Sequence, residues 1–288
     1  MTKVTDKYAA PGRRPLVACD FSPPRGGEAS ALAPAATLDA DFICVAYNPG
    51  KAVRADSLAA ASYIQRAFGK DVIFNLATRD MNKIALQSHL LGAQVLGVEN
   101  VMIIQGDPFN EQERARVSQV GDFTATELVA AARGLNEGVD YRGLKLQAPA
   151  SLCIGTSADL GRGVEDEARL ARRKLDAGAQ FLLTQPIFDM AERRRFIDLV
   201  WGAGKEPDLP GLWGLQVLAA GGVVFSSVPA RLREQLEQGR DGVEIALELY
   251  ESFRAEGIDA VYLVPPIMRG GARDYDAAVR VLAAMRQA

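Results

Sequence analysis

The sequence predicts an α/β fold, specifically a (β/α)8 TIM barrel that occupies residues 1–288 as a single domain. Three observations support this prediction. Short apolar runs typical of strands alternate with longer helical patterns from one end of the chain to the other. The chain is long enough for eight such units, which need about 250 residues. No linker rich in proline or serine divides it. An open doubly wound sheet with fewer strands fits the same alternation and is the alternative.

The expected strands are mostly continuous apolar runs rather than alternating ones. This pattern is typical of parallel strands that helices cover on one face and that pack inside the fold on the other. We expect strands at Leu16–Phe21, Phe42–Tyr47, Val72–Leu76, Val101–Gln105, Ser151–Gly155, Phe181–Gln185, Leu215–Leu218 and Ala260–Val264.

Longer segments with helical periodicity lie between the expected strands. Capping residues such as Asp56, Asp80 and Thr126 mark where helices begin, and glycines such as Gly97 and Gly178 mark where they end. We expect helices at Ser57–Phe68, Met81–Leu96, Ala125–Leu135, Glu165–Ala177, Ala191–Gly202, Val243–Glu256 and Tyr275–Met285.

Three segments depart from this regular alternation. Residues 1–14 are polar and charged without the apolar stretch of a secretory signal, and we expect a flexible N-terminal arm. The long charged stretch Asp107–Asp122 is expected to form a mobile lid or a surface loop. The glycine-rich stretch Ala219–Val228 lacks a helical pattern, so we expect the seventh unit of the barrel to be irregular.

Composition and charge narrow the classes of partner. The chain is 48% hydrophobic and 24% charged, as an ordinary globular protein is. Its formal net charge of −3 argues against a dedicated nucleic-acid binder. No apolar run reaches the roughly 18 residues that a membrane span needs. We therefore expect a cytoplasmic protein that acts on a small molecule.

The cysteines and the histidine exclude two kinds of site. Cys19, Cys44 and Cys153 are far apart in apolar surroundings, so we expect buried free thiols rather than disulfides or a zinc site. His89 is the single histidine and lies in a helical pattern, which rules out a multi-histidine metal site and favours a packing role. No metal ligand set is expected.

Candidate functional residues lie where the expected strands end, because the active sites of such barrels lie at that face. Asp20 ends the first strand; an acid in an apolar strand is either paired structurally or kept partly protonated for use as an acid. Asp107 follows the fourth strand in a Gly-Asp-Pro sequence, which either presents the carboxylate at the rim or only forms a turn. Gln185 ends the sixth strand, where its amide can recognise the edge of a heterocycle.

Charged residues elsewhere are more ambiguous. Glu167 and Lys174 lie about two helical turns apart and can share one face, which is either a cofactor contact or a solvated surface. Arg269 and Arg273 follow the last strand. The sequence lacks a P-loop, and Gly161-Arg162-Gly163 lacks the third glycine of a dinucleotide-binding fingerprint.

Several segments, in order along the chain, resemble the methylenetetrahydrofolate reductase family, most closely its short bacterial form and the reductase half of fusions with homocysteine methyltransferase. The resemblance covers roughly residues 15–286. The segments are CDFSPPRG (19–26), RADSLAAA (54–61), ATRDMNKIALQSHLLGAQVLGVENVMIIQGDP (77–108), KLDAGAQFLLTQPIFD (174–189) and YLVPPIMRGGARDYDAAVRVL (262–282).

The resemblance implies reduction of the methylene bridge of 5,10-methylenetetrahydrofolate to a methyl group, or the reverse, by FAD that takes its hydride from NADH or NADPH. Asp20 matches the family's general acid, which is a glutamate, and would protonate the substrate as its ring opens. Asp107 and Gln185 match the pterin-binding pair in type. Arg269 is expected to pair with the glutamate tail of folate.

The flavin contacts are matched in part. Lys174 matches a flavin-contacting lysine, and Glu167 stands where the family has aspartate. Asp107 is expected to contact the cofactor as well as the pterin. Ala46, Asn75 and Gln105 replace a threonine, a histidine and an arginine.

These replacements leave three alternatives open. The first is direct hydride transfer from nicotinamide without flavin. The second is a non-catalytic folate- or flavin-binding subunit of a methyl-transfer complex, and the third is a methyl transferase that uses the same pterin site. A homo-oligomer or a methyltransferase partner fits each of them.

Overall fold

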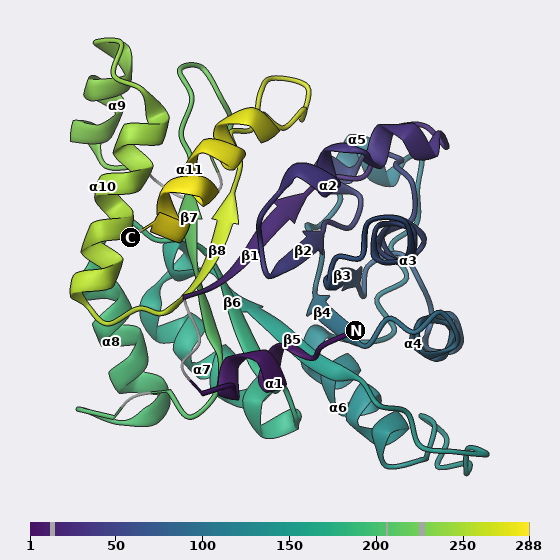
Figure 1. Cartoon of the computed structure of the whole chain (residues 1–288). Helices are drawn as coiled ribbons and strands as arrows, with labels where there is room; N and C mark the ends of the chain where they lie inside the picture. Colours follow the sequence, from purple (N-terminus) through teal and green to yellow (C-terminus); the bar gives the residue numbers. More distant parts are fainter. Residues whose placement is uncertain (12–14, 206, 225–227, 288) are drawn as a thin grey trace.

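The computed structural model describes residues 1–11, 15–205, 207–224 and 228–287. Eight parallel strands follow one another around a closed barrel, and the first strand pairs with the last (Figure 1). This confirms the predicted barrel and excludes the open sheet. The strands are β1 Leu16–Phe21, β2 Phe42–Val45, β3 Val72–Ala77, β4 Asn100–Ile104, β5 Cys153–Ala158, β6 Phe181–Pro186, β7 Gly211–Gln216 and β8 Ala260–Val264.

Each strand divides its side chains between two cores. In β1, Leu16 and Ala18 belong to an apolar cluster inside the barrel, whereas Val17, Cys19 and Phe21 belong to the larger cluster between the barrel and its helices. Side chains of a strand alternate between its two faces, and here both faces are buried. The continuous apolar runs in the sequence follow from this arrangement.

Helices surround the barrel, as Figure 1 shows. Most begin with an aspartate, asparagine or threonine whose side chain accepts a backbone hydrogen bond; α6 has a full capping box between Thr124 and Glu127. The helices are α1 Val4–Ala9, α2 Pro34–Thr37, α3 Ser57–Phe68, α4 Lys83–Val95, α5 Glu111–Arg114, α6 Ala125–Asn136, α7 Val164–Ala177, α8 Met190–Trp201, α9 Ala230–Glu237, α10 Gly242–Ala255 and α11 Tyr275–Gln287, with short 3-10 turns at Ala29–Leu32, Pro49–Lys51 and Leu160–Arg162.

The predicted bounds of two strands were wrong because glycines lie inside them. β5 runs past Gly155 to Ala158, and β7 begins at Gly211, before the predicted start. A Cβ at Gly155 would collide with the Phe181 ring, and one at Gly214 would lie 2.5 Å from the Gln185 carbonyl oxygen. These glycines allow close packing within the barrel and do not mark turns.

The N-terminal segment also differs from the prediction of a flexible arm. Residues Val4–Ala9 form α1, and Val4 is fully buried in the cluster inside the barrel. Its backbone N–H donates to the Asn100 side chain at the start of β4. The helix therefore closes the end of the barrel opposite the carboxyl ends of the strands (Figure 1). Residues 12–14 of the predicted arm lie outside the described residues.

The seventh unit is irregular, as predicted. The described residues 219–224 form no helix, and residues 225–227 lie outside the described part of the stretch. Two helices, α9 and α10, then precede β8, whereas the sequence pattern predicted only the second. The long stretch after β4 is mostly exposed and contains one short helix, α5.

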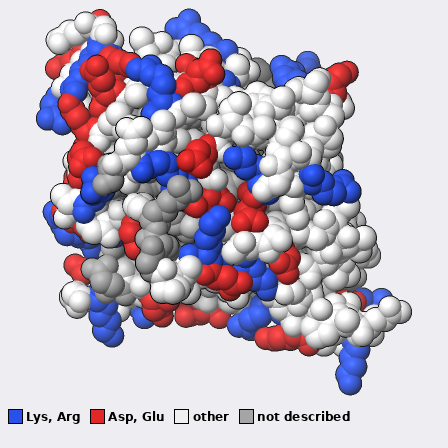
Figure 2. Space-filling view, viewed as in Figure 1, with Lys and Arg blue, Asp and Glu red and all other residues white. Residues whose placement is uncertain are grey.

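The expected packing roles of the cysteines and of His89 are confirmed. The three cysteines are buried free thiols. His89 lies on α4 with its ring 5.9 Å from that of Phe74. Among the described helices, none is both long and apolar enough to cross a bilayer. Acidic and basic side chains are interleaved over the face shown in Figure 2, which is unlike the single-sign basic surface of nucleic-acid binders.

Candidate active site

Lower in the barrel the inward positions are apolar, for example Phe42 and Phe181. Three polar side chains lie near the carboxyl ends of their strands: Asp20 on β1, Asn75 on β3 and Gln185 on β6. They border a cavity of about 260 Å³ that opens at the carboxyl ends of the strands. The lining also includes Ala46, Tyr47, Arg79, Gln105, Asp107, Ser157, Asp159, Arg162, Glu167, Lys174, Tyr262 and Arg273.

Asp20 is 2% exposed, and both of its carboxylate oxygens are hydrogen-bonded. The Tyr262 hydroxyl donates to Oδ1 at 2.9 Å, and Arg273 Nε donates to Oδ2 at 2.8 Å. Tyr262 is the inward residue in the middle of β8, which pairs directly with β1. Arg273 comes from the loop after β8, so the last strand and its loop supply both partners. The sequence allowed two interpretations of Asp20, a structurally paired carboxylate or a partly protonated acid, and the structure shows the paired carboxylate.

Burial controls the ionisation of the groups around Asp20. Desolvation, with the negative charge of Asp20 as a smaller cause, raises the pKa of the Cys19 and Cys44 thiols well above their usual value. The same two causes raise the pKa of Tyr262. These groups are therefore neutral at ordinary pH, and the ion pair between Asp20 and Arg273 carries the charge in this part of the cavity.

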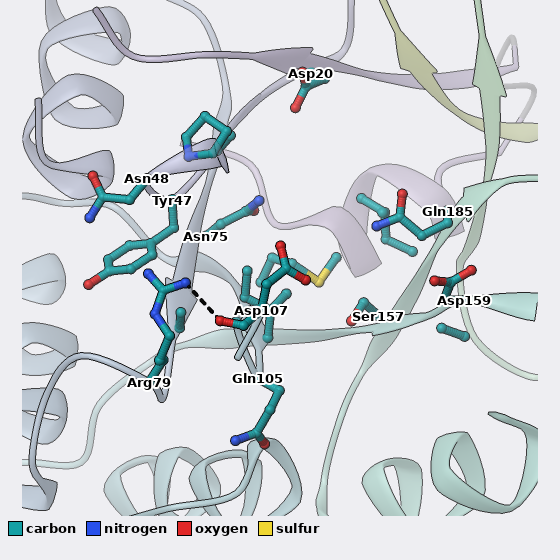
Figure 3. A pocket seen from close by; sticks show the side chains of 18 of the residues that line it. Asp20, Tyr47, Asn48, Asn75, Arg79, Gln105, Asp107, Ser157, Asp159 and Gln185 are labelled. Atoms are coloured by element: carbon teal, nitrogen blue, oxygen red, sulfur yellow. Dashed lines mark hydrogen bonds between the residues drawn. The ribbon is translucent and has the colours of Figure 1, made fainter. Parts of the chain in front are cut away.

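Asp107 and Gln185 line the same cavity as Asp20; in Figure 3 Asp20 lies at the top of the view, Asp107 near its centre and Gln185 to the right. The Asp107 side chain is 71% exposed, and its nearest charged partner is Arg162 at 3.9 Å. The Asp107 carbonyl oxygen accepts a hydrogen bond from Arg79. The three side chains that the sequence predicted to converge thus border one cavity, although they belong to β1, β6 and the loop after β4.

The three replaced flavin positions line the cavity, and the side-chain oxygens of Asn75 and Gln105 already accept hydrogen bonds. Ala46 has no polar side chain. Asn75 Oδ1 accepts a hydrogen bond from Cys44 Sγ. Gln105 Oε1 accepts from the Ala125 N–H at the start of α6, and in Figure 3 its side chain points away from the cavity. The side-chain oxygen of Gln105 is therefore used to cap a helix, and a cofactor contact by Gln105 stays a prediction.

Glu167 and Lys174 face the cavity and are buried rather than forming a solvated surface. The Asp159 N–H donates to Glu167, and Lys174 Nζ donates to the Ser157 carbonyl oxygen at 2.7 Å. Desolvation lowers the pKa of Lys174 to about 8, although the charge of Glu167 opposes this shift. Lys174 is thus a buried cation on the β5 side of the cavity.

The sequence favoured one of the two arginines after β8 as a substrate contact, and the structure places the other one at the cavity. Arg269 is exposed and is not among the residues that line the cavity. Arg273 lines the cavity and pairs with Asp20. Sequence reasoning also missed Tyr262 and Arg79. Tyr262 was detectable, because it shares the inward register of Ala260 in a short apolar strand.

The comparisons with known proteins agree with this geometry. The family profile described as "Methylenetetrahydrofolate reductase" matches residues 5–264. The chain belongs to the methylenetetrahydrofolate reductase family. Among curated relatives, it is 22% identical over 239 residues to "Methylenetetrahydrofolate reductase (NADH) 1" of Arabidopsis thaliana, a match that covers 77% of this chain and 40% of that protein. It is also 22% identical over 242 residues to "Methylenetetrahydrofolate reductase 1" of Schizosaccharomyces pombe, with 77% and 38% covered.

The methylenetetrahydrofolate reductases that the chain matches are longer proteins, and the chain spans about 40% of the length of the Arabidopsis relative. A solved structure shares the fold over 96% of both chains, with a TM-score of 0.63 and 13% sequence identity. It is described as an uncharacterized protein from Clostridium thermocellum that binds two copies of 5-methyl-5,6,7,8-tetrahydrofolic acid.

Proposed function

We propose that the chain reduces 5,10-methylenetetrahydrofolate to 5-methyltetrahydrofolate with NADH or NADPH as the hydride donor, or catalyses the reverse with the oxidised nicotinamide as the hydride acceptor. The observation that carries the proposal is the convergence of Asp20, Asp107 and Gln185 on one cavity in a member of this family. A cytoplasmic location and a homo-oligomer or a methyltransferase partner belong to the same proposal.

The pterin edge would bind at Asp107 and Gln185. A carboxylate accepts hydrogen bonds from the 2-amino group and N3, and an amide beside it can both donate and accept. The Asp107 carboxylate is exposed and lies 3.9 Å from Arg162, so it is accessible to a ligand. A negative charge there would also stabilise the iminium cation that develops during the reaction.

The reaction needs a proton before the hydride. Opening of the imidazolidine ring breaks the bond between the methylene carbon and N10; N10 takes the proton, and the hydride then adds to the carbon of the iminium. We propose Asp20 as the proton donor. Each of its oxygens accepts one hydrogen bond, from Tyr262 and from Arg273, and keeps a second lone pair that could hold the proton.

The three replaced positions do not offer FAD the side chains that the resemblance implies. Ala46 has no polar group, Asn75 Oδ1 accepts from a thiol, and Gln105 Oε1 caps α6. Lys174 keeps the expected position, but its ammonium group donates to the Ser157 carbonyl oxygen. The side chains at these positions favour direct hydride transfer from the nicotinamide ring to the folate carbon. We therefore assign no step of the reaction to flavin.

Isotope transfer tests both parts of the proposal. Purified protein is mixed with 5,10-methylenetetrahydrofolate and NADH deuterated at the transferred position, and the methyl group of the product is examined by mass spectrometry. Direct transfer predicts full retention of deuterium and no flavin absorbance in the protein. Loss of deuterium to water together with a bound flavin would replace the direct route by a flavin route, because a hydrogen on reduced flavin N5 exchanges with solvent.

A non-catalytic folate-binding subunit is the second candidate. The ion pair between Asp20 and Arg273 favours this candidate, because the pair occupies the carboxylate that has to carry the proton. Tight binding of 5-methyltetrahydrofolate without oxidation of NADH or NADPH, in the presence of methylenetetrahydrofolate, would support this candidate against the reductase.

A further inference from the structure

Arg79 connects the barrel to both ends of the long loop after β4. Its Nη1 donates to the Asp107 carbonyl oxygen at 3.1 Å, where the loop begins. Its guanidinium group lies 4.6 Å from the centre of the Phe109 ring. At the far end of the loop, the Val120 N–H donates to the Arg79 carbonyl oxygen at 3.0 Å. One residue, two positions beyond β3, therefore contacts the loop at three points.

The guanidinium group of Arg79 is itself held in one orientation. Nε and Nη2 donate to the two oxygens of Asp80 at 2.6 and 2.7 Å, which is the bidentate geometry of arginine and carboxylate. Burial, together with a hydrogen bond to Asp80, raises the pKa of the neighbouring Tyr47 to about 12, so Tyr47 stays neutral beside this pair. Arg79 is only 4% exposed.

The backbone before Asp107 packs directly on Arg79. Gly106 has a φ of +78°, and a Cβ there would lie 3.1 Å from Arg79 Cβ and 3.3 Å from Ala77 Cβ. Only glycine fits this conformation and this approach without displacing a neighbour. The direction in which the chain leaves β4, and with it the position of Asp107, therefore depends on the place of Arg79.

We infer that Arg79, oriented by Asp80, is a positioning residue that fixes the Asp107 backbone so that its carboxylate faces the pterin. This inference rests on the proposed function, because Asp107 matters only if it binds the substrate. Arg79 Nη1 donates to the Asp107 carbonyl oxygen while Nε and Nη2 donate to Asp80, so the contacts of the guanidinium group assign it a role that acts through the Asp107 backbone.

The test compares Arg79→Gln, Asp80→Asn and Asp107→Ala by titration with 5-methyltetrahydrofolate and, separately, with NADH. Loss of one charged hydrogen bond to the Asp107 backbone should weaken folate binding about tenfold in Arg79→Gln, with a smaller loss in Asp80→Asn. NADH affinity should stay unchanged in both. Arg194→Gln, which breaks an exposed arginine–carboxylate pair on α8, is the matched control and should bind folate as the unaltered protein does.

The decisive measurement is the double variant Arg79→Gln with Asp107→Ala. If Arg79 acts through Asp107, the double variant should bind folate no more weakly than Asp107→Ala alone. Additive losses, or an equal loss of NADH affinity, would overturn the inference in favour of a general structural role. If Arg79→Gln does not fold, the same cycle is run with Asp80→Asn.

The outcomes also separate this inference from the proposed function. Asp107→Ala that binds folate normally contradicts the proposed pterin site itself. If Asp107→Ala binds folate weakly while Arg79→Gln binds it normally, only the positioning role of Arg79 is contradicted.

Discussion

Two aspartate–arginine pairs border the cavity, and they differ in almost every physical respect. Asp20 and Arg273 are in contact at 2.8 Å, with side chains 4% and 3% exposed. Asp107 and Arg162 are 3.9 Å apart, with side chains 71% and 65% exposed. The first pair is a buried ion pair with a third partner in Tyr262, whereas the second is a weak contact at the surface.

The difference shows that one cavity can hold one carboxylate whose position is fixed by the fold and another that can exchange its partner for a ligand. Breaking a buried ion pair leaves one charge without a partner in a poorly solvated place, so its geometry is fixed by the fold. An exposed pair contributes about 0–1 kcal/mol and gives way easily to a ligand. On the β1 and β8 side of the cavity, the fold therefore fixes the positions of the charged side chains before a substrate binds. The loop after β4 supplies a carboxylate that is available to bind a ligand.

The largest effect is expected from Asp20→Asn. The variant breaks the buried ion pair between Asp20 and Arg273 and should lower the free energy of unfolding by about 3–5 kcal/mol. It should also abolish folate reduction. Urea denaturation measures the first effect and turnover of methylenetetrahydrofolate the second. Replacing Arg273 with methionine in the same chain should restore part of the stability, and normal folate reduction in Asp20→Asn would show that the proton comes from another group.

Lys174 tests whether the β5 side of the cavity also holds a buried charge. Burial lowers its pKa from the usual 10.5 to about 8, so between these values the unfolded chain binds a proton that the folded chain has lost. Stability should therefore rise with pH across this interval, by up to about 3 kcal/mol. Below pH 8 both states are protonated and the contribution is constant. Urea midpoints at pH 7.5 and pH 10 should show this rise in the unaltered protein relative to Lys174→Met; an equal pH dependence in both would contradict the buried cation.

Asp107→Ala should separate binding from stability. Because the side chain is exposed, the free energy of unfolding should change by less than about 0.5 kcal/mol. Loss of the hydrogen bonds from the pterin to a charged group should weaken binding of 5-methyltetrahydrofolate about a hundredfold. Calorimetric titration and thermal unfolding measure the two quantities, and a large loss of stability would mean that Asp107 is part of the fold rather than of the site.

The smallest effect is expected from Arg162→Ala, which removes the partner of Asp107. An exposed contact at this distance should change the free energy of unfolding by less than about 0.5 kcal/mol and folate affinity by less than about twofold. The same two measurements apply. A strong loss of folate affinity would show that the exposed pair acts as a unit, and the contrast with Asp20 and Arg273 would then be wrong.

The sequence predicted the barrel and placed Asp20 and Gln185 on the correct strands, but it did not predict which side chains make contact. Asp20 and Gln185 were found because a polar residue at the end of an apolar strand stands out locally. The use of the Gln105 side-chain oxygen at the start of α6 could not be predicted, because no local pattern links Gln105 to Ala125. Arg269 was preferred for folate binding, whereas Arg273, four residues later, is the arginine that reaches the cavity.

The sequence by itself determined the alternation of strands and helices, the apolar inner positions and the polar residues at the carboxyl ends of the strands. These features depend on side-chain periodicity within a few residues. Only the tertiary structure decided which charges meet. Asp20 and Arg273 are 253 positions apart and become neighbours only when β1 pairs with β8 to close the barrel. Which partner a buried charge meets depends on closure of the whole sheet, and a pattern within a few residues of sequence cannot predict that contact.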